Sequence, residues 1–127
     1  ISPTIVDHLI SDDKEIVVDP PASRRVISEE ASKTIRLMMV DAVNLGEAKW
    51  SKPKNLDVAG KTGTAQIPIQ GHYDPTKTIA SFIGFYPSRN PRYTMLVTLT
   101  EPQTSQWGSE TAAPLWFNLA TRINIAN

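Results

Sequence analysis

The chain has 127 residues, with 13 basic and 13 acidic side chains and a formal net charge of +0. That length allows one domain with a core of its own. The balanced charge does not predict binding to nucleic acid or to an anionic membrane surface. The sequence contains no cysteine, which excludes disulfides, thiolate metal sites and a cysteine nucleophile. The only histidines, His8 and His72, lie far apart and are interpreted as surface or loop residues.

The chain begins at Ile1 rather than at methionine, with Ser2 and Pro3 directly behind it. It has no signal-peptide pattern and no apolar run near the length needed to span a bilayer. We expect it to be a piece of a longer protein.

Short extended segments and one helix are expected in the first third of the chain. Residues 4–10 form a mixed apolar segment, residues 15–19 indicate a strand closed by Pro20 and Pro21, and residues 24–27 indicate another extended piece. Ser28 is a good N-cap for a helix that ends near Gly46. The apolar positions of this helix recur at helical spacing and are predicted to face the core: Ala31, Ile35, Met38, Ala42 and Leu45.

The rest of the chain predicts a sheet and a second helix. After a loop at 47–55, residues 56–67 are expected to be extended, 68–77 to form a loop, and 78–86 and 93–100 to form an antiparallel hairpin about a turn at 87–91. The last helix has Pro114 in its first turn. Its expected apolar face comprises Ala112, Leu115 or Trp116, Leu119 and Ile123. The order predicts an α+β fold in which two helices cover an antiparallel sheet.

The most informative stretch is Val58–Gln66, with the sequence VAGKTGTAQ. A phosphate-binding loop would need a glycine five positions before Gly60, where the chain has Asn55. Such a loop must also open a helix, which Gly63 and Pro68 oppose. We therefore reject a phosphate-binding loop.

The Lys61-Thr62-Gly63 string instead matches an element of penicillin-recognising serine acyltransferases. A strand that borders a cleft can offer backbone N–H groups to an acyl oxyanion. Its hydroxyls and a cation can bind a substrate carboxylate. Glycine at position 63 keeps the strand bare, so that a substrate can lie against it.

Further motifs occur in a fixed order around this string. They are Ile27-Ser28 at a helix start, Asp57–Gln66, Ala80–Pro87 (ASFIGFYP), Asn90–Tyr93, and Gly108 with Ala112-Ala113-Pro114 and Phe117. In these motifs the chain resembles, over nearly its whole length, the C-terminal part of the transpeptidase domain of class B penicillin-binding proteins. The resemblance implies the corresponding part of a β-lactamase-like fold.

The resemblance also implies roles for four residues. Lys61 would face the cleft and support the family's S-x-N serine and its proton-transfer network. The hydroxyls of Thr62 and Thr64 would bind the carboxylate of a substrate or β-lactam, beside Gly63. The backbone N–H of Thr64 would form half of the oxyanion hole. The alternative is that Thr62 and Thr64 are ordinary β-branched strand residues.

No nucleophile of the family's kind is expected in this chain. Ser11–Lys14 and Ser51–Lys54 have the S-x-x-K pattern, but the first is a charged turn and the second contains Pro53, which blocks the required helical turn. The S-x-N string Ser88–Asn90 follows the Lys61 motif rather than preceding it. We interpret residues 1–127 as the C-terminal fragment of a single domain whose nucleophile lies upstream.

The resemblance implies a peptidoglycan D,D-transpeptidase that forms a serine acyl-enzyme with stem peptides and binds β-lactams. This mechanism implies no metal and no organic cofactor. It would act in cell-wall synthesis at the extracytoplasmic face of a bacterial membrane, anchored by an upstream segment, in either division or elongation. The fragment should be inactive alone, and its exposed strand edge and apolar patches favour self-association unless the missing N-terminal part covers them. The alternatives are a fragment of a β-lactam sensor or serine β-lactamase, or a non-catalytic interaction module with the same fold.

Overall fold

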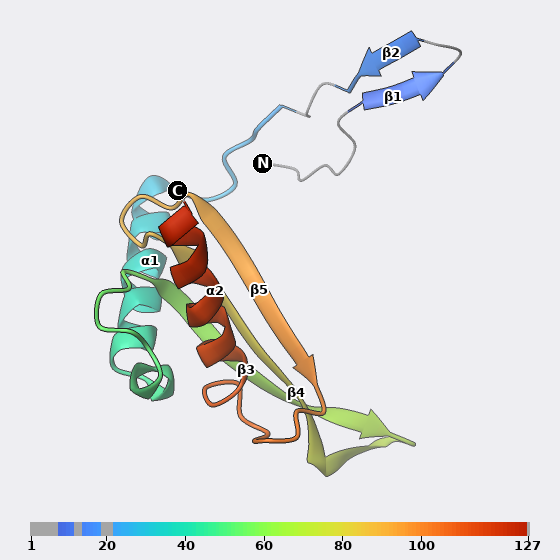
Figure 1. Cartoon of the computed structure of the whole chain (residues 1–127), viewed down its shortest axis with the longest axis vertical. Coiled ribbons are helices and arrows are strands. Elements are labelled where there is room, and N and C mark those ends of the chain that lie inside the picture. The colour runs from blue at the N-terminus through green and yellow to red at the C-terminus, as the bar shows by residue number, and fades with distance from the viewer. Residues whose placement is uncertain (1–7, 12–13, 19–21, 127) are drawn as a thin grey trace. The chain divides into compact units, whose positions relative to one another are not determined.

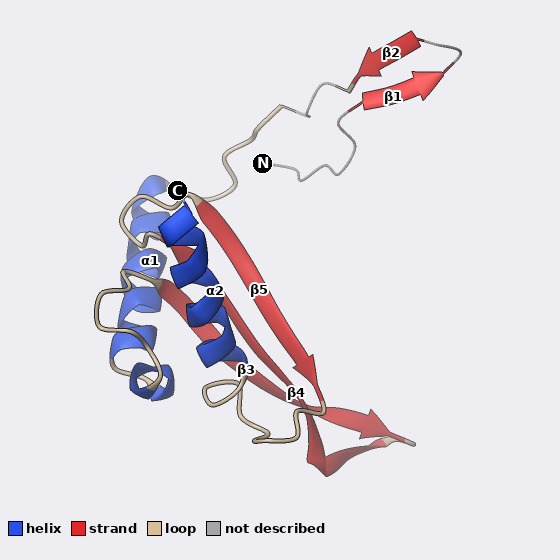
Figure 2. Cartoon of the chain, in the orientation of Figure 1, coloured by secondary structure: helices blue, strands red, loops and turns tan. Residues whose placement is uncertain are grey.

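The computed structural model describes residues 8–11, 14–18 and 22–126. The chain divides into two compact units, residues 1–32 and 33–127, and the division falls within helix α1. Figure 1 labels the elements in chain order, and Figure 2 separates the helices from the strands. The α+β class expected from the sequence is confirmed.

The first unit contains a short antiparallel hairpin of β1 (His8–Ser11) and β2 (Lys14–Val17). The strand predicted at 15–19 is confirmed as far as Val17, Val18 lies beyond its end, and Asp19, Pro20 and Pro21 lie outside the described residues. Residues 24–27, expected to be extended, belong to no strand. The N-cap prediction is confirmed, because the Ser28 hydroxyl oxygen accepts a 3.1 Å hydrogen bond from the backbone N–H of Ala31.

The second unit is built on one antiparallel sheet with the order β3-β4-β5. Its strands are β3 (Ala59–Ile69), β4 (His72–Tyr86) and β5 (Tyr93–Thr100). The predicted strand at 93–100 and its antiparallel pairing with the preceding strand are confirmed. A 3-10 helix, η1 (Glu47–Trp50), lies in the predicted loop that precedes β3.

The loop predicted at 68–77 is wrong, because β3 and β4 continue through most of it as a long hairpin. Gln70 and Gly71 form its turn with φ angles of 47° and 89°. Two successive positive φ angles give a turn whose twist matches that of the flanking strands. The register shifts between Gln66 and Pro68, which lets the strand tolerate a proline that cannot donate to the ladder.

Asp74 organises the part of β4 that bulges opposite this shift. Its Oδ1 accepts hydrogen bonds from the backbone N–H groups of Thr76 at 2.8 Å and Lys77 at 3.0 Å. The Thr76 N–H, helped by the Thr76 hydroxyl, holds the pKa of Asp74 below its ordinary value. Lys77 in turn pairs with Glu101 at 3.0 Å, and this partner raises the pKa of the lysine. Local polar contacts therefore replace ladder pairing here.

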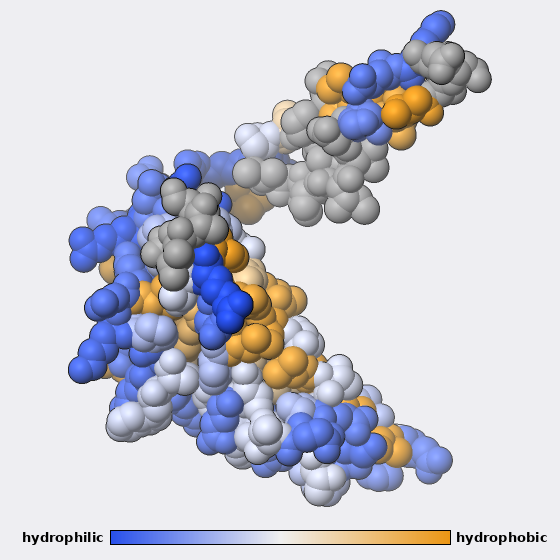
Figure 3. Space-filling model, viewed as in Figure 1, coloured by the Kyte–Doolittle hydropathy of each residue, from blue (hydrophilic) through white to orange (hydrophobic). Residues whose placement is uncertain are grey.

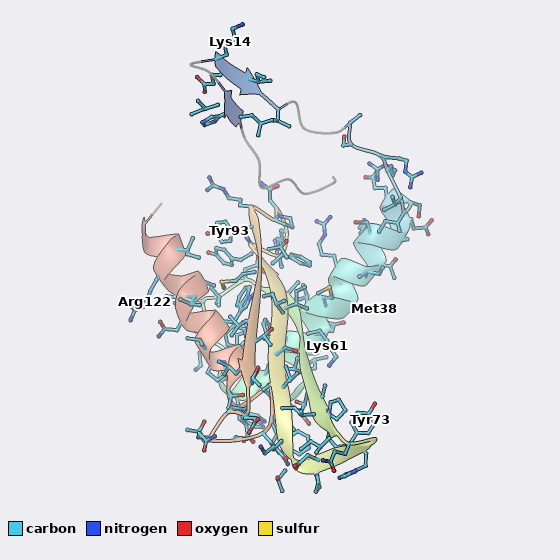
Figure 4. All side chains as sticks on the ribbon, turned by 90° about the vertical axis from the view of Figure 1, so that its right-hand side faces the viewer. Lys14, Met38, Lys61, Tyr73, Tyr93 and Arg122 are labelled. Atoms are coloured by element: carbon cyan, nitrogen blue, oxygen red, sulfur yellow. The ribbon has the colours of Figure 1, made fainter. Side chains whose placement is uncertain are left out.

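Three aromatic rings join α2 (Ala112–Ala126) to the sheet. The ring of Phe82 on β4 lies 5.2 Å from the rings of both Trp116 and Phe117, within the range of favourable aromatic pairs. The Trp116 indole N–H also donates to the carbonyl of Met95 on β5 at 2.8 Å, so its polar group is satisfied inside the core. α2 packs on this face of the sheet, against β4 and β5 (Figures 1 and 4).

The predicted core face of α1 (Glu29–Asn44) is wrong at three of its five positions, whereas Ala31 and Ala42 are half-buried. Ile35, Met38 and Leu45 are 49%, 64% and 72% exposed. The helix packs through the neighbouring stripe instead, with Val43 buried and Met39 and Val40 half-buried. Helical periodicity identifies apolar stripes but does not show which of two adjacent stripes meets the core.

The predicted face of α2 is partly correct. Ala112 and Trp116 are buried as expected, whereas Leu119 and Ile123 remain exposed beside the buried Ala120. Pro114 lies in the first turn as predicted. Figure 3 shows apolar side chains that reach the surface where α2 and β5 lie side by side.

Substitution of Phe82 by alanine should lower the free energy of unfolding of this chain by about 3–5 kcal/mol, because it opens a cavity beneath Trp116 and Phe117. Leu96→Ala is the matched control, since Leu96 is 61% exposed on β5 and its loss should cost about 0.5 kcal/mol or less. Urea denaturation followed by circular dichroism measures both changes. Equal losses for the two variants would contradict the position of the core.

Candidate active-site strand

Lys61–Thr64 lie on β3, which pairs only with β4 among the described residues. β3 is therefore an edge strand of this sheet, and backbone groups on its outer side are open to a ligand. In the register, Lys61 pairs with Ile83, whereas Thr64 pairs with the buried Ala80. Since directly paired residues share a face, Lys61 lies on the face opposite α2 (Figure 4), whereas Thr64 lies on the face that α2 covers.

Lys61 and Thr62 are in contact through their polar groups. The Lys61 ammonium donates to the carbonyl oxygen of Thr62 at 3.1 Å and lies 3.4 Å from its hydroxyl oxygen. The Lys61 side chain is exposed and that of Thr62 is half-buried. This edge therefore carries a cation beside a hydroxyl, the combination that binds a carboxylate.

The Thr64 hydroxyl oxygen accepts a 3.0 Å hydrogen bond from the backbone N–H of Gly108. A hydroxyl that accepts one hydrogen bond keeps its own O–H free to donate. The contact thus orients the side chain and leaves a donor available for an anionic ligand.

Glycine is needed at position 108 because that residue lies directly on the sheet. A Cβ atom there would come within 2.4 Å of the Gly63 carbonyl oxygen and 2.7 Å of the Ser81 carbonyl oxygen. Both atoms are backbone atoms of a paired ladder and cannot move aside cheaply. The sequence indicated Gly108 only as part of a family motif, because a contact between residues so far apart has no local signal.

Gly63 meets a weaker constraint from the neighbouring strand, because the atom in the way belongs to a side chain. A Cβ atom on Gly63 would lie 2.5 Å from the Ser81 hydroxyl oxygen. That hydroxyl approaches the Gly63 carbonyl at 3.5 Å. Glycine at position 63, predicted to leave room for a substrate, therefore also leaves room for the Ser81 side chain.

The two S-x-x-K strings do not place serine and lysine on one helical turn. Ser11 and Lys14 face each other across the β1–β2 hairpin. Ser51 follows η1 and donates to the carbonyl of Ala48 at 3.2 Å, and Lys54 lies in the turn beyond it. Neither string has the geometry in which a desolvated lysine takes a serine proton.

Ser88, from the S-x-N string, has a packing contact that sequence reasoning missed. It is buried, and its hydroxyl donates to Asp57 Oδ1 at 2.5 Å. Its backbone N–H also donates to the Asp57 carbonyl at 2.8 Å. These bonds tie the turn after β4 to the chain just before β3 and so help to place the Lys61–Thr64 strand.

His8 and His72 lie on β1 and at the start of β4, in different units of the chain. Among the described residues, no group of three or more histidine and acidic side chains is arranged to hold a metal ion. Within the same residues, no helix is long and apolar enough to cross a membrane.

The sequence is similar to known proteins over most of its length. Residues 1–121 match the sequence family of the penicillin binding protein transpeptidase domain, and the chain belongs to that family. It is 40% identical over 101 residues to stage V sporulation protein D of Bacillus subtilis, covering 79% of this chain and 16% of that protein. It is 34% identical over 109 residues to the probable peptidoglycan D,D-transpeptidase PenA of Neisseria flavescens, covering 84% of this chain and 27% of that protein.

The fold is also similar to solved structures of this family. Penicillin binding protein 3 of Mycobacterium tuberculosis, solved in complex with ampicillin, superimposes with a TM-score of 0.74 at 27% identity, over 93% of this chain and 29% of that one. The chain therefore spans less than a third of each of these three relatives.

Replacing Thr64 by valine should accelerate hydrogen exchange at the Gly108 amide, because the variant removes the oxygen that accepts this N–H. A net hydrogen-bond contribution of about 1 kcal/mol corresponds to a roughly fivefold faster exchange. Thr64→Ser keeps the oxygen and should leave the rate near that of the wild type. Amide exchange measured by NMR tests this contact, and equal rates in all three proteins would contradict it.

Proposed function

We propose that this chain is the substrate-holding part of a serine D,D-transpeptidase that cross-links peptidoglycan stem peptides and is acylated by β-lactams. The observation that carries the proposal is the position of Lys61–Thr64 on an edge strand, with the ammonium of Lys61 beside the hydroxyl of Thr62. An open edge can add a peptide as a further strand, so that backbone groups supply affinity and adjacent side chains supply specificity.

The acyl donor would lie along the free edge of β3. Its terminal carboxylate would accept hydrogen bonds from the hydroxyls of Thr62 and Thr64, near the positive charge of Lys61. Thr64 is suited to this role because Gly108 already fixes its side chain and leaves its O–H free to donate.

The scissile carbonyl would lie at the backbone N–H of Thr64, one of two donors to the oxyanion. The second donor would be the N–H of the nucleophilic serine. Attack by the serine hydroxyl on the D-alanyl-D-alanine bond forms an ester and releases D-alanine. An amine of a neighbouring stem peptide then attacks the ester, forms the cross-link and regenerates the serine. Lys61 would support the proton transfers, and no metal or organic cofactor is needed for these steps.

The serine and its partner lysine would lie in a preceding part of the same domain. The serine–lysine strings in this chain lie in a strand hairpin and a turn, which supports their exclusion as nucleophiles. Ile83 and Leu96 leave an apolar patch on the sheet face that bears Lys61, and such a patch favours a partner. We propose that the preceding part of the domain packs on this patch. We also propose that the longer protein works at the extracytoplasmic face of a bacterial membrane.

The isolated chain should form no covalent adduct with a fluorescent penicillin, whereas the longer protein that contains it should be labelled at a serine upstream of Ile1. Gel fluorescence and mass spectrometry of the labelled peptide measure this difference. Labelling of the isolated chain at Ser11 or Ser51 would overturn the proposal. Rapid hydrolysis of the adduct by water in the longer protein would instead identify a β-lactamase.

In the longer protein, Lys61→Ala should slow acylation by penicillin about a hundredfold, the usual size of a lost proton-transfer partner. Lys54→Ala is the matched control, since Lys54 is exposed in the turn before β3, and its removal should leave the rate unchanged. Stopped-flow or timed labelling gives both rate constants. A larger loss for Lys54 than for Lys61 would mean that the Ser51–Lys54 string takes part in the reaction.

A further inference from the structure

A cavity lies between η1 and the segment that leads into α2. It has a volume of about 510 Å³ and is lined by Glu47, Trp50, Ser51, Trp107, Ser109, Glu110 and Pro114. None of these residues belongs to the Lys61–Thr64 strand. The cavity therefore requires an explanation of its own.

Two exposed tryptophans line this cavity. Trp50 is 85% exposed and Trp107 is 49% exposed, whereas Trp116 is fully buried in the core. Large aromatic side chains are usually withdrawn from water, and exposed ones are enriched at sites where proteins bind partners.

Two carboxylates line the same cavity. Glu47 Oε2 lies 3.4 Å from the Ser109 hydroxyl, and Glu110 Oε2 accepts a 2.6 Å hydrogen bond from the Ser105 hydroxyl. Neither glutamate forms an ion pair with any residue in the described part of the chain. The lining is therefore aromatic and negatively charged.

The walls of the cavity are held to each other. The Ser109 hydroxyl approaches Glu47, and the Ser51 hydroxyl lies 3.5 Å from the Ser109 carbonyl oxygen. The wall that carries Trp107 is also fixed to the sheet, because the next residue, Gly108, donates to Thr64. A ligand would thus meet groups that are already in place.

Trp50 has a cation near its ring in this structure. The Nζ atom of Lys49 lies 4.6 Å from the centroid of the Trp50 ring. This contact is within the range in which a cation is attracted to an aromatic face. Both residues are exposed, so another cation can compete for that ring.

We propose that this cavity binds an arginine side chain of a partner protein. A guanidinium group is planar, stacks on aromatic rings and donates in parallel to a carboxylate, and it is more weakly hydrated than an ammonium group. Tryptophan rings beside unpaired carboxylates match each of these properties. The proposal does not depend on the catalytic role of Lys61–Thr64.

NMR of the transpeptidase that contains this chain tests the proposal through the indole N–H signals of Trp50 and Trp107. The probe is the peptide acetyl-Gly-Arg-Gly-amide, with its citrulline analogue as a neutral control of the same shape. The arginine peptide should shift both signals in a saturable manner, with the buried Trp116 signal as the internal reference. Equal shifts with the citrulline peptide would overturn the proposal.

Glutamine variants test whether binding needs the negative charges of the cavity, because they remove the charge and keep the size of the side chain. The double variant Glu47→Gln and Glu110→Gln should weaken binding about tenfold, since it removes two charge-assisted acceptors. Glu30→Gln is the control, because Glu30 lies in the first turn of α1, and it should bind as the wild type does. An unchanged affinity in the double variant would overturn the proposal.

Lys49→Met gives a result that misfolding could not produce. It removes the competing cation from Trp50, so the arginine peptide should bind about two- to fivefold more tightly, the equivalent of one exposed cation–π contact. Weaker or unchanged binding would mean that the ligand does not use the Trp50 ring.

Discussion

The packing of Phe82 against Trp116 and Phe117 is the contact on which the second unit depends. Complete burial of each such side chain contributes about 1.5–3 kcal/mol, and each aromatic pair adds about 0.5–1.5 kcal/mol. Phe82 lies at the centre of the sheet, on the strand that pairs with both β3 and β5. The cluster therefore holds α2 on the sheet and, with it, the segment that leads into α2. Gly108 in that segment reaches the carbonyl of Gly63 and the hydroxyl of Thr64.

This connection explains why the Lys61–Thr64 strand can be both open and ordered. An edge strand has unpaired backbone groups on one side, and nothing in its own ladder fixes the side chains there. Here Gly108 holds Thr64 from the helix face, and Ser88 holds Asp57 just before the strand begins. The edge can then meet a ligand with its hydroxyl oriented, and less conformational entropy is lost on binding.

Local patterns in the sequence predicted the elements whose signals are themselves local. The strand at 93–100, the Ser28 cap and the position of Pro114 depend on neighbouring residues, and all three agree with the structure. The prediction of a loop at 68–77 is wrong because proline and glycine, which usually end strands, lie within one hairpin here. A two-residue turn and a register shift accommodate both within one hairpin.

The helix faces and the site show where sequence patterns stop being informative. Ile35 and Met38 have the spacing of a core stripe, yet they are exposed, because the adjacent stripe of α1, which carries Val43, packs into the core. The Lys61–Thr64 motif could be found in the sequence, since its residues are contiguous. The contacts of Thr64 with Gly108 and of Asp57 with Ser88 could not, because they join segments that only the fold brings together.

The central claim is that the edge of β3 holds the acyl donor. Its most direct test is a crystal structure of the transpeptidase that contains this chain, acylated by a penicillin. We predict that the acyl carbonyl oxygen lies about 3 Å from the backbone nitrogen of Thr64, within hydrogen-bond range. The penicillin carboxylate should lie at the hydroxyls of Thr62 and Thr64, with the ester on a serine upstream of Ile1. An acylated serine remote from β3, with the strand edge covered by protein, would contradict it.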